Sequence, residues 1–142
     1  MFRVGSIFIP VTNLDQSKKW YQKNLGVSVI DEWEFGDDKG LGMYFPNSPT
    51  QLGLVKVEKP QPMEFTIRGK KKNVYFNFVV EDIETVHRDL IANGVTTTEI
   101  EDFGGMKGFE FFDPDGNPFS VVSEEENSPF HSDQIKEKQQ RG

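Results

Sequence analysis

The stretch FFDPDGNPFSVVSE, Phe111–Glu124, decides how the chain is interpreted. Apolar runs rich in Phe and Val flank DPDGNP, which predicts two strands, Gly108–Phe112 and Pro118–Ser123, joined by a tight turn. Gly116 is free to take the positive φ that such a turn requires. The stretch therefore predicts a closing β-hairpin.

Working back from this hairpin, the same order of elements occurs twice in the chain. Each copy contains a strand, a helix preceded by an N-capping Asn or Asp and followed by Gly, and three further strands. In the first copy the expected elements are strand Ile7–Val11, helix Leu14–Asn24, and strands Val27–Phe35, Leu41–Phe45 and Leu52–Glu58. In the second copy they are strand Asn73–Val80, helix Ile83–Asn93, and strands Val95–Ile100, Gly108–Phe112 and Pro118–Ser123.

This repeat predicts an α+β protein built from two βαβββ modules in a single domain. The first module is expected at residues 1–58 and the second at residues 73–124. Between them, residues 59–72 hold two prolines and a lysine run and are expected to form a linker with one short strand at Glu64–Ile67. Residues 125–142 are polar and are expected to be disordered or loosely docked.

Composition limits the classes of partner and the compartment. The net charge of −7 disfavours nucleic acid, because an acidic protein repels the phosphate backbone. No apolar run approaches the roughly 20 residues of a membrane span, and the N-terminus is too short for a signal peptide. The absence of cysteine excludes disulfides and thiolate zinc sites. A cytoplasmic protein with no nucleic-acid or membrane partner is expected.

The repeat resembles the vicinal oxygen chelate superfamily, which includes glyoxalase I, the bleomycin-resistance proteins, the fosfomycin-resistance thiol transferases and the extradiol dioxygenases. FIPVTNLDQSKKWYQKNLGV is similar to the first strand and helix of this family, FVVEDIETVHRDLIANGV to the start of its second module, and GFEFFDPDGNPFSVV to its closing hairpin. The resemblance covers Ile7 to Glu124. It implies mixed sheets curved into a cup, helices on the outer face, and modules that pair, often across a homodimer.

In the metal enzymes of this family, four side chains from the first and fourth strands of each module line the cup. Carried over to this chain, the first-strand positions are Ser6 and Tyr75, and the last-strand position of the second module is Ser120. For the fourth strand of the first module we assign Lys56. None of these is a usual ligand of a divalent metal. The resemblance therefore predicts no metal and no other cofactor, and a divalent metal is disfavoured.

Strand alternation gives each sheet one apolar face, suited to packing under the helices, and one mixed face. The mixed face is predicted to line the cup and to bind a small organic molecule. The alternative is that this face is solvated or lies against a partner chain. The predicted ligand-binding residues are Ser6, Phe8, Lys56, Tyr75, Asn77, Ser120 and Val122. Lys56 would pair with an anionic group, unless it is simply a surface lysine.

Few side chains are candidates for acid–base chemistry. Glu110 alternates with Phe109 and Phe111 and is a weak catalytic candidate, against the alternative of a solvated strand charge. His87 is expected to have a structural role beside the second helix, and His131 is expected to be solvated in the tail.

Three functions remain open at this point. The first is a metal-independent member of the superfamily that binds a small organic molecule. The second is a lyase, transferase or dioxygenase of the same fold with non-standard metal ligands. The third is a non-catalytic dimerisation module.

Overall fold

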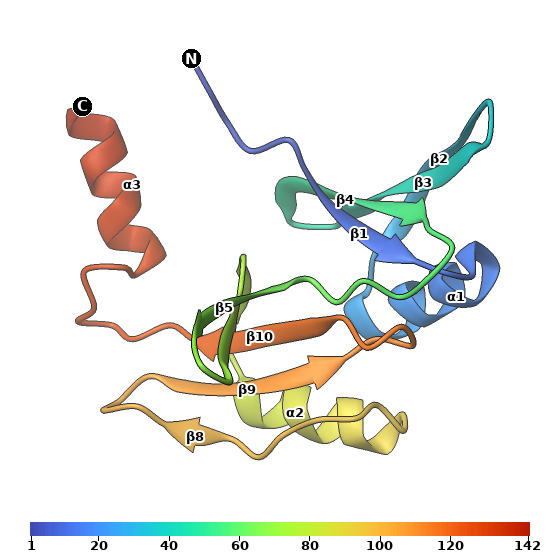
Figure 1. The fold of residues 1–142 in the computed structure, drawn as a ribbon. Coiled ribbons are helices and arrows are strands. Elements are labelled where there is room, and N and C mark those ends of the chain that lie inside the picture. Colours follow the sequence, from blue (N-terminus) through green and yellow to red (C-terminus); the bar gives the residue numbers. More distant parts are fainter. The chain divides into compact units, whose positions relative to one another are not determined.

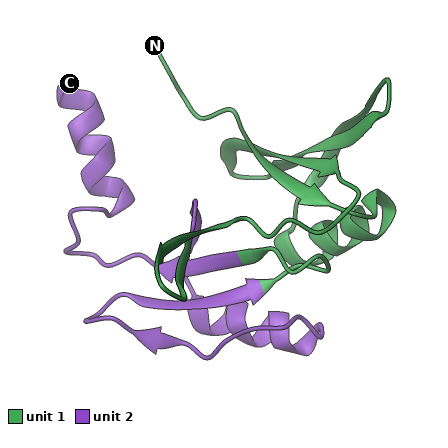
Figure 2. Cartoon of the chain, in the orientation of Figure 1, with its two compact units in different colours: residues 1–73, 112–118 green, residues 74–111, 119–142 purple.

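The computed structural model describes all residues, 1–142, and divides into two compact units (Figure 2). Unit 1 consists of residues 1–73 and 112–118, and unit 2 of residues 74–111 and 119–142. Compared with the expected modules, unit 1 also includes the expected linker, Asn73 and the turn at 112–118, and unit 2 also includes the tail. Each unit is described by itself below.

Unit 1 contains six strands and one helix (Figure 1). These are β1 (Ser6–Val11), α1 (Leu14–Leu25), β2 (Ser28–Phe35), β3 (Asp38–Phe45), β4 (Ser48–Lys56), β5 (Glu64–Arg68) and, apart from its last residue, β6 (Lys71–Val74). The four-stranded sheet has the order β1-β4-β3-β2, in which β1 and β4 are parallel and the other pairs antiparallel.

The capping residues set the limits of α1 as expected. The side chain of Asn13 accepts a hydrogen bond from the backbone N–H of Gln16, and Gly26 ends the helix with φ of 70°. Alternate strand residues pack on the helix side of the sheet. The buried apolar side chains of this core are Ile9, Val11, Tyr21, Leu41, Met43, Leu52 and Leu54.

The expected linker forms more structure than predicted. β5 and β6 pair as a separate two-stranded sheet around Gly69, whose φ is 53°. β6 occupies the start of the strand predicted at Asn73–Val80, and the chain bends at Tyr75 before β7 begins. The prediction of one continuous strand was therefore wrong, because the apolar run is divided between two sheets.

Unit 2 contains the other elements (Figure 1). These are β7 (Asn77–Val80), α2 (Ile83–Ala92), β8 (Glu101–Asp102), β9 (Lys107–Phe112), β10 (Pro118–Ser123) and α3 (Ser132–Arg141). The second four-stranded sheet has the order β7-β10-β9-β8, with β7 parallel to β10. It repeats the strand order of the first sheet, which confirms the internal repeat.

The core of unit 2 is aromatic. The rings of Phe111 and Phe119 lie 5.2 Å apart between centroids, and Phe78 lies 5.7 Å from Phe119. Ile83 and Leu90 of α2 are buried against this sheet. Rings at these separations contribute about 0.5–1.5 kcal/mol per pair beyond their buried area.

The strand predicted at Val95–Ile100 is reduced to an isolated bridge between Thr97 and Phe111. Thr98 explains this loss, because its hydroxyl accepts the hydrogen bond of the Glu110 backbone N–H at 2.9 Å. A side chain thus takes the place of a backbone acceptor, and a regular ladder does not form.

The C-terminal tail also differs from the expectation of disorder. Residues 132–141 form α3, and the Nδ1 atom of His131 accepts the backbone N–H of Asp133 at its start. No residue of α3 is buried. No helix in residues 1–142 is long and apolar enough to cross a membrane.

Candidate functional site

The sheet of unit 1 has a face opposite α1, which we call the open face of unit 1. Three glycines, Gly40, Gly42 and Gly53, form its floor. A Cβ atom at Gly53 would lie 2.7 Å from Cδ1 of Phe8, so the Phe8 ring rests against bare backbone. Trp33 covers Gly40 in the same way. Phe8 remains 61% exposed and Trp33 38%, so both rings present their outer surfaces to solvent.

The parallel registers of the two sheets identify equivalent positions. Phe8 and Asn77 each precede the N-cap of the following helix by five residues. Phe8 pairs with Gly53, and Asn77 pairs with Ser120. Gly53 is therefore the unit 1 equivalent of Ser120, and the assignment of this position to Lys56 was wrong by three residues.

Lys56 does not lie on the open face. It pairs with Val11, which is fully buried on the helix side, and it shares that side with Leu52 and Leu54. It lines a hollow of about 640 Å³ beside the start of α1, together with Asp15 and other charged residues, and Trp33 and Gly40 line the same hollow. Lys56 was predicted to line the cup because Val55 and Val57 were expected to be the buried side of this strand.

The sheet of unit 2 likewise has an open face opposite α2. Asn77 and Ser120 are paired on it, and Val122 lies two residues further along β10 on the same side. Tyr75 does not share this face as part of β7, because it lies in the bend before the strand. Of the four residues predicted on this face, three come together here.

Glu110 and Ser120 line one hollow of about 230 Å³ on this face. Glu99 and Glu101 line it too, and Phe103 lies beside Gly108 at its edge. Within residues 1–142, no three His, Cys, Asp or Glu side chains are grouped so that they could hold a metal ion. The hollow is acidic, but its carboxylates do not converge on one point.

A second hollow of about 300 Å³ contains Asn77, Val79 and Val122, and its wall comes from the tail. Phe130 and His131, just before α3, line it. His131 is held by its neighbours, because its Nε2 atom lies 3.5 Å from Oε2 of Glu124 while Nδ1 accepts from Asp133. The sequence predicted a solvated His131, and the structure places it at the edge of a cavity.

His87 has the predicted structural position. Its Nε2 atom donates to the carbonyl oxygen of Thr98 at 2.8 Å, and its ring meets Phe109 edge-on at 4.7 Å between centroids. Phe109 is buried on the helix side of the sheet. His87 is therefore directed away from the open face and does not serve it.

The DPDG turn is the centre of a buried polar network in unit 1. Tyr21 donates its hydroxyl to Oδ2 of Asp113 at 2.6 Å, across 92 positions of sequence. Oδ1 of Asp113 accepts the backbone N–H groups of Asp115 and Asn117, as the turn chemistry predicted. The amide of Asn117 also donates to the Pro10 carbonyl.

Burial shifts both ionisable groups of this network. Burial, and next the negative charge of Asp113, raise the pKa of Tyr21, so the phenol stays protonated and donates. Burial also raises the pKa of the Asp113 carboxyl, although hydrogen bonds from Asn117 and Tyr21 partly oppose this effect. The carboxylate of Asp115 accepts the backbone N–H of Thr12 at 3.1 Å, so both aspartates of the turn have structural partners within unit 1.

Sequence reasoning missed the glycine floor and the two tail residues. A signal existed for the glycines, because Gly40 and Gly42 alternate along one strand, and glycine inside a strand often marks close approach of another group. Nothing in the sequence pointed from Phe130 and His131 to the open face of unit 2, since their proximity to Val79 depends on the path of the tail.

With Gly53 in place of Lys56, the four positions where the resemblance implies metal ligands are Ser6, Gly53, Tyr75 and Ser120. Gly53 offers no side chain, and its space is taken by the Phe8 ring. Hydroxyl groups without imidazole or carboxylate are poor ligands for zinc, nickel, iron or manganese. This set of donors does not fit the metal that the family's enzymes use.

Comparison with known proteins gives relatives of one kind. The chain is 28% identical over 149 residues to a lactoylglutathione lyase of Schizosaccharomyces pombe, covering 90% of this chain and 49% of that protein. The chain thus spans about half the length of this curated relative.

Solved structures share the fold. A glyoxalase/bleomycin resistance protein/dioxygenase superfamily member from Sphaerobacter thermophilus superposes with a TM-score of 0.72 at 23% identity, covering 87% of this chain and 98% of that one. TnmS3, an antibiotic binding protein from Streptomyces sp. CB03234, superposes with a TM-score of 0.68 at 16% identity, covering 88% and 98%.

A family profile matches residues 3–121, which include both sheets and both of the repeated helices. Together with the repeated strand order and the DPDG turn, this match establishes the family. The chain belongs to the Glyoxalase/Bleomycin resistance protein/Dioxygenase superfamily.

Proposed function

We propose that this protein binds a small, largely apolar organic molecule on the open face of unit 1, without a metal. The observation that carries the proposal is the pair of aromatic rings, Phe8 and Trp33, resting on glycine backbone with their outer surfaces exposed. A ring supported on one side by the sheet is held in place before binding, so little conformational freedom is lost when a flat ligand stacks on it.

The donor set supports binding rather than metal chemistry. Ser6 and Gly53 stand at the two unit 1 positions where the resemblance implies metal ligands, and neither supplies an imidazole or a carboxylate. TnmS3, with the same fold, is named as an antibiotic binding protein. A protein that sequesters a ligand needs shape and aromatic surface but no ligand quartet.

The binding test uses N-phenyl-1-naphthylamine, an uncharged aromatic dye whose emission rises in apolar surroundings. Saturable binding to the full chain is expected, and Phe8→Ala or Trp33→Ala should weaken it roughly tenfold. Phe65→Ala, on β5 of the separate two-stranded sheet, is the matched control and should bind as the wild type does. Unchanged binding by both face variants would overturn the proposal.

A second candidate is a metal-dependent enzyme, which the similarity to a lactoylglutathione lyase favours. Elemental analysis after exposure to nickel, zinc, manganese and iron, followed by desalting, separates the two. We expect no retained metal. Stoichiometric retention that is lost in Glu110→Gln would support the enzyme and a site around the Glu110 hollow.

A further inference from the structure

The open face of unit 2 carries two neighbouring hollows that share Val122. The one beside the tail, about 300 Å³, has exposed apolar side chains in its mixed lining: Val79 is 53% exposed, Phe130 is 87% exposed, and Met106 lines it too. Exposed apolar side chains gathered around a concave site are the usual lining of a small-molecule pocket. The volume suits a ligand with a ring or two.

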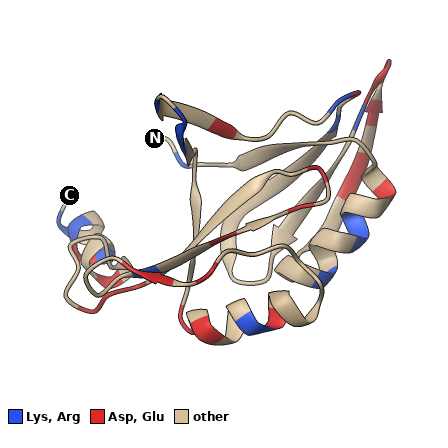
Figure 3. Ribbon diagram, turned by 60° about the horizontal axis from the view of Figure 1, so that its bottom comes forward, with Lys and Arg blue, Asp and Glu red and all other residues tan.

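The charged residues around both hollows have one sign. Glu99, Glu101 and Glu110 line the first, and Glu124 and Glu125 line the second. No Lys or Arg lines either hollow. Elsewhere acidic and basic residues are interspersed, as along α1 and α2 in Figure 3.

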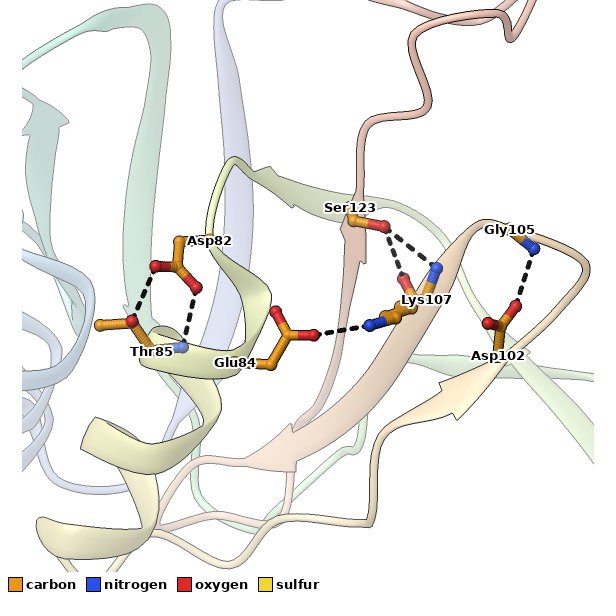
Figure 4. Close-up of polar contacts among 7 residues, drawn as sticks. All are labelled: Asp82, Glu84, Thr85, Asp102, Gly105, Lys107 and Ser123. Carbon is orange, nitrogen blue, oxygen red and sulfur yellow. Dashed lines mark hydrogen bonds and ion pairs between the residues drawn. The ribbon is translucent and has the colours of Figure 1, made fainter.

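The lysine of β9 neutralises this face only in part. Lys107 holds its Nζ atom 2.7 Å from Oε1 of Glu84 on α2, and this hydrogen bond raises the pKa of Lys107 and lowers that of Glu84 (Figure 4). Only the backbone of Lys107 contacts β10, through the hydroxyl of Ser123. Its charge is paired first with Glu84, and the charge of Glu125 also raises the pKa of Lys107. One lysine beside five carboxylates leaves these hollows with an excess of negative charge.

The tail is part of this site, although it lies beyond the region that the family profile matches. Glu124 accepts the backbone N–H and the hydroxyl of Ser132 at 3.3 and 3.2 Å, and it lies near His131. These contacts fold the segment between β10 and α3 back on itself and bring Phe130 to the hollow. The carboxylate of Glu125 is not used in them, and it lines the hollow while its charge acts on Lys107.

We propose that these two hollows form a binding site for an organic cation with an aromatic body, walled on one side by Phe130 and His131. The inference rests on the proposed function in that both concern small organic ligands, but it assigns a different face, a charge and a contribution from the tail.

The test compares thioflavin T, a cationic benzothiazolium dye, with its uncharged benzothiazole analogue, using fluorescence titration of the full chain. The cation should bind at least fivefold more tightly, and raising the salt from low to about 0.5 M should remove most of that difference, because screening shortens the range of the carboxylates. Phe130→Ala should weaken the binding of both dyes, whereas Glu125→Gln should weaken only the binding of the cation. Each effect should be roughly three- to tenfold in affinity.

Phe2→Ala and Glu126→Gln are the matched controls, since both residues are exposed and neither lines a hollow. Circular dichroism checks that every variant is folded. Equal affinity for the two dyes, or wild-type binding by Phe130→Ala and Glu125→Gln, would overturn the inference. Displacement of the dye by submillimolar calcium or magnesium would also overturn it, because the carboxylates would then form a metal site.

The outcomes are separable from those of the proposed function. Suppose that Phe8→Ala loses binding of the uncharged naphthylamine dye, while Phe130→Ala binds thioflavin T as the wild type does. This result would support the proposed function of unit 1 and reject the site on unit 2. The opposite pattern would retain the site on unit 2 alone.

Discussion

Tyr21 shows how a single side chain can depend on a residue far away in sequence. It is fully buried, and its hydroxyl donates a hydrogen bond to Asp113, 92 positions later. A buried hydrogen bond to a carboxyl contributes more than one to a neutral acceptor, about 1.5–3 kcal/mol. The contact therefore stabilises unit 1 through a turn that the chain reaches only near its end.

The Tyr21→Phe variant should lower the free energy of unfolding by about 1–3 kcal/mol, because the ring still fills its space while Asp113 loses a donor. Urea unfolding followed by circular dichroism measures this change. Tyr44→Phe, at an exposed tyrosine, is the control and should change stability by less than about 0.5 kcal/mol. Equal effects of the two substitutions would show that the Tyr21 hydroxyl is not used.

Asp113 makes the stability of the protein depend on pH in a definite direction. Its folded-state pKa is raised above the ordinary value of 3.8, so ionisation costs more in the folded than in the unfolded chain. The stability that it contributes is fully present below pH 3.8 and falls as the pH rises through the higher folded-state pKa.

The wild type should therefore lose stability relative to Asp113→Asn as the pH rises over that window. Urea unfolding of both proteins at a series of pH values measures the difference. A difference that is constant with pH, or that grows in favour of the wild type, would contradict the raised pKa.

At the scale of the element, α1 contains a buried group without a partner. The hydroxyl of Ser17 is fully buried and makes no hydrogen bond. Serine also has a lower helix propensity than alanine. We expect Ser17→Ala to stabilise the protein by about 0.5–1.5 kcal/mol, measured by urea unfolding. Destabilisation would mean that the hydroxyl has a role in the packing of α1.

The sheet of unit 1 depends on glycine where an aromatic ring lies against its backbone. In Gly53→Ala the new Cβ would lie 2.7 Å from Phe8, so the ring must move and the open face must change. When Phe8 is present, we expect Gly53→Ala to weaken binding of the uncharged naphthylamine dye severalfold. In a Phe8→Ala background the same substitution should have little further effect, and additive effects would contradict the contact.

At the scale of the whole molecule, the homodimer implied by the family resemblance stays a prediction. Dimers in which two copies present the same face to each other are the commonest assemblies of soluble proteins. Light scattering should give a mass of about twice the 16.3 kDa of the chain. A mass of one chain at micromolar concentration would reject the dimer.

The repeat, both of its helices with their caps, and the closing hairpin followed from the sequence. They depend on local chemistry that sequence displays directly: Asn13 and Asp82 as caps, Gly26 and Gly116 at positive φ, and alternation in the strands. The family resemblance followed from the same stretches, and the family profile confirms it.

The sequence by itself determined the family, the order of the elements and the lack of usual metal ligands at Ser6 and Ser120. Only the tertiary structure decided which residues share a face. The register of β1 with β4 turned Lys56 to the helix side and set Gly53 beneath Phe8, while the path of the tail brought Phe130 to β7. Register and chain path are set by pairing between distant segments, and a strand carries little local signal of which partner residue will lie opposite it.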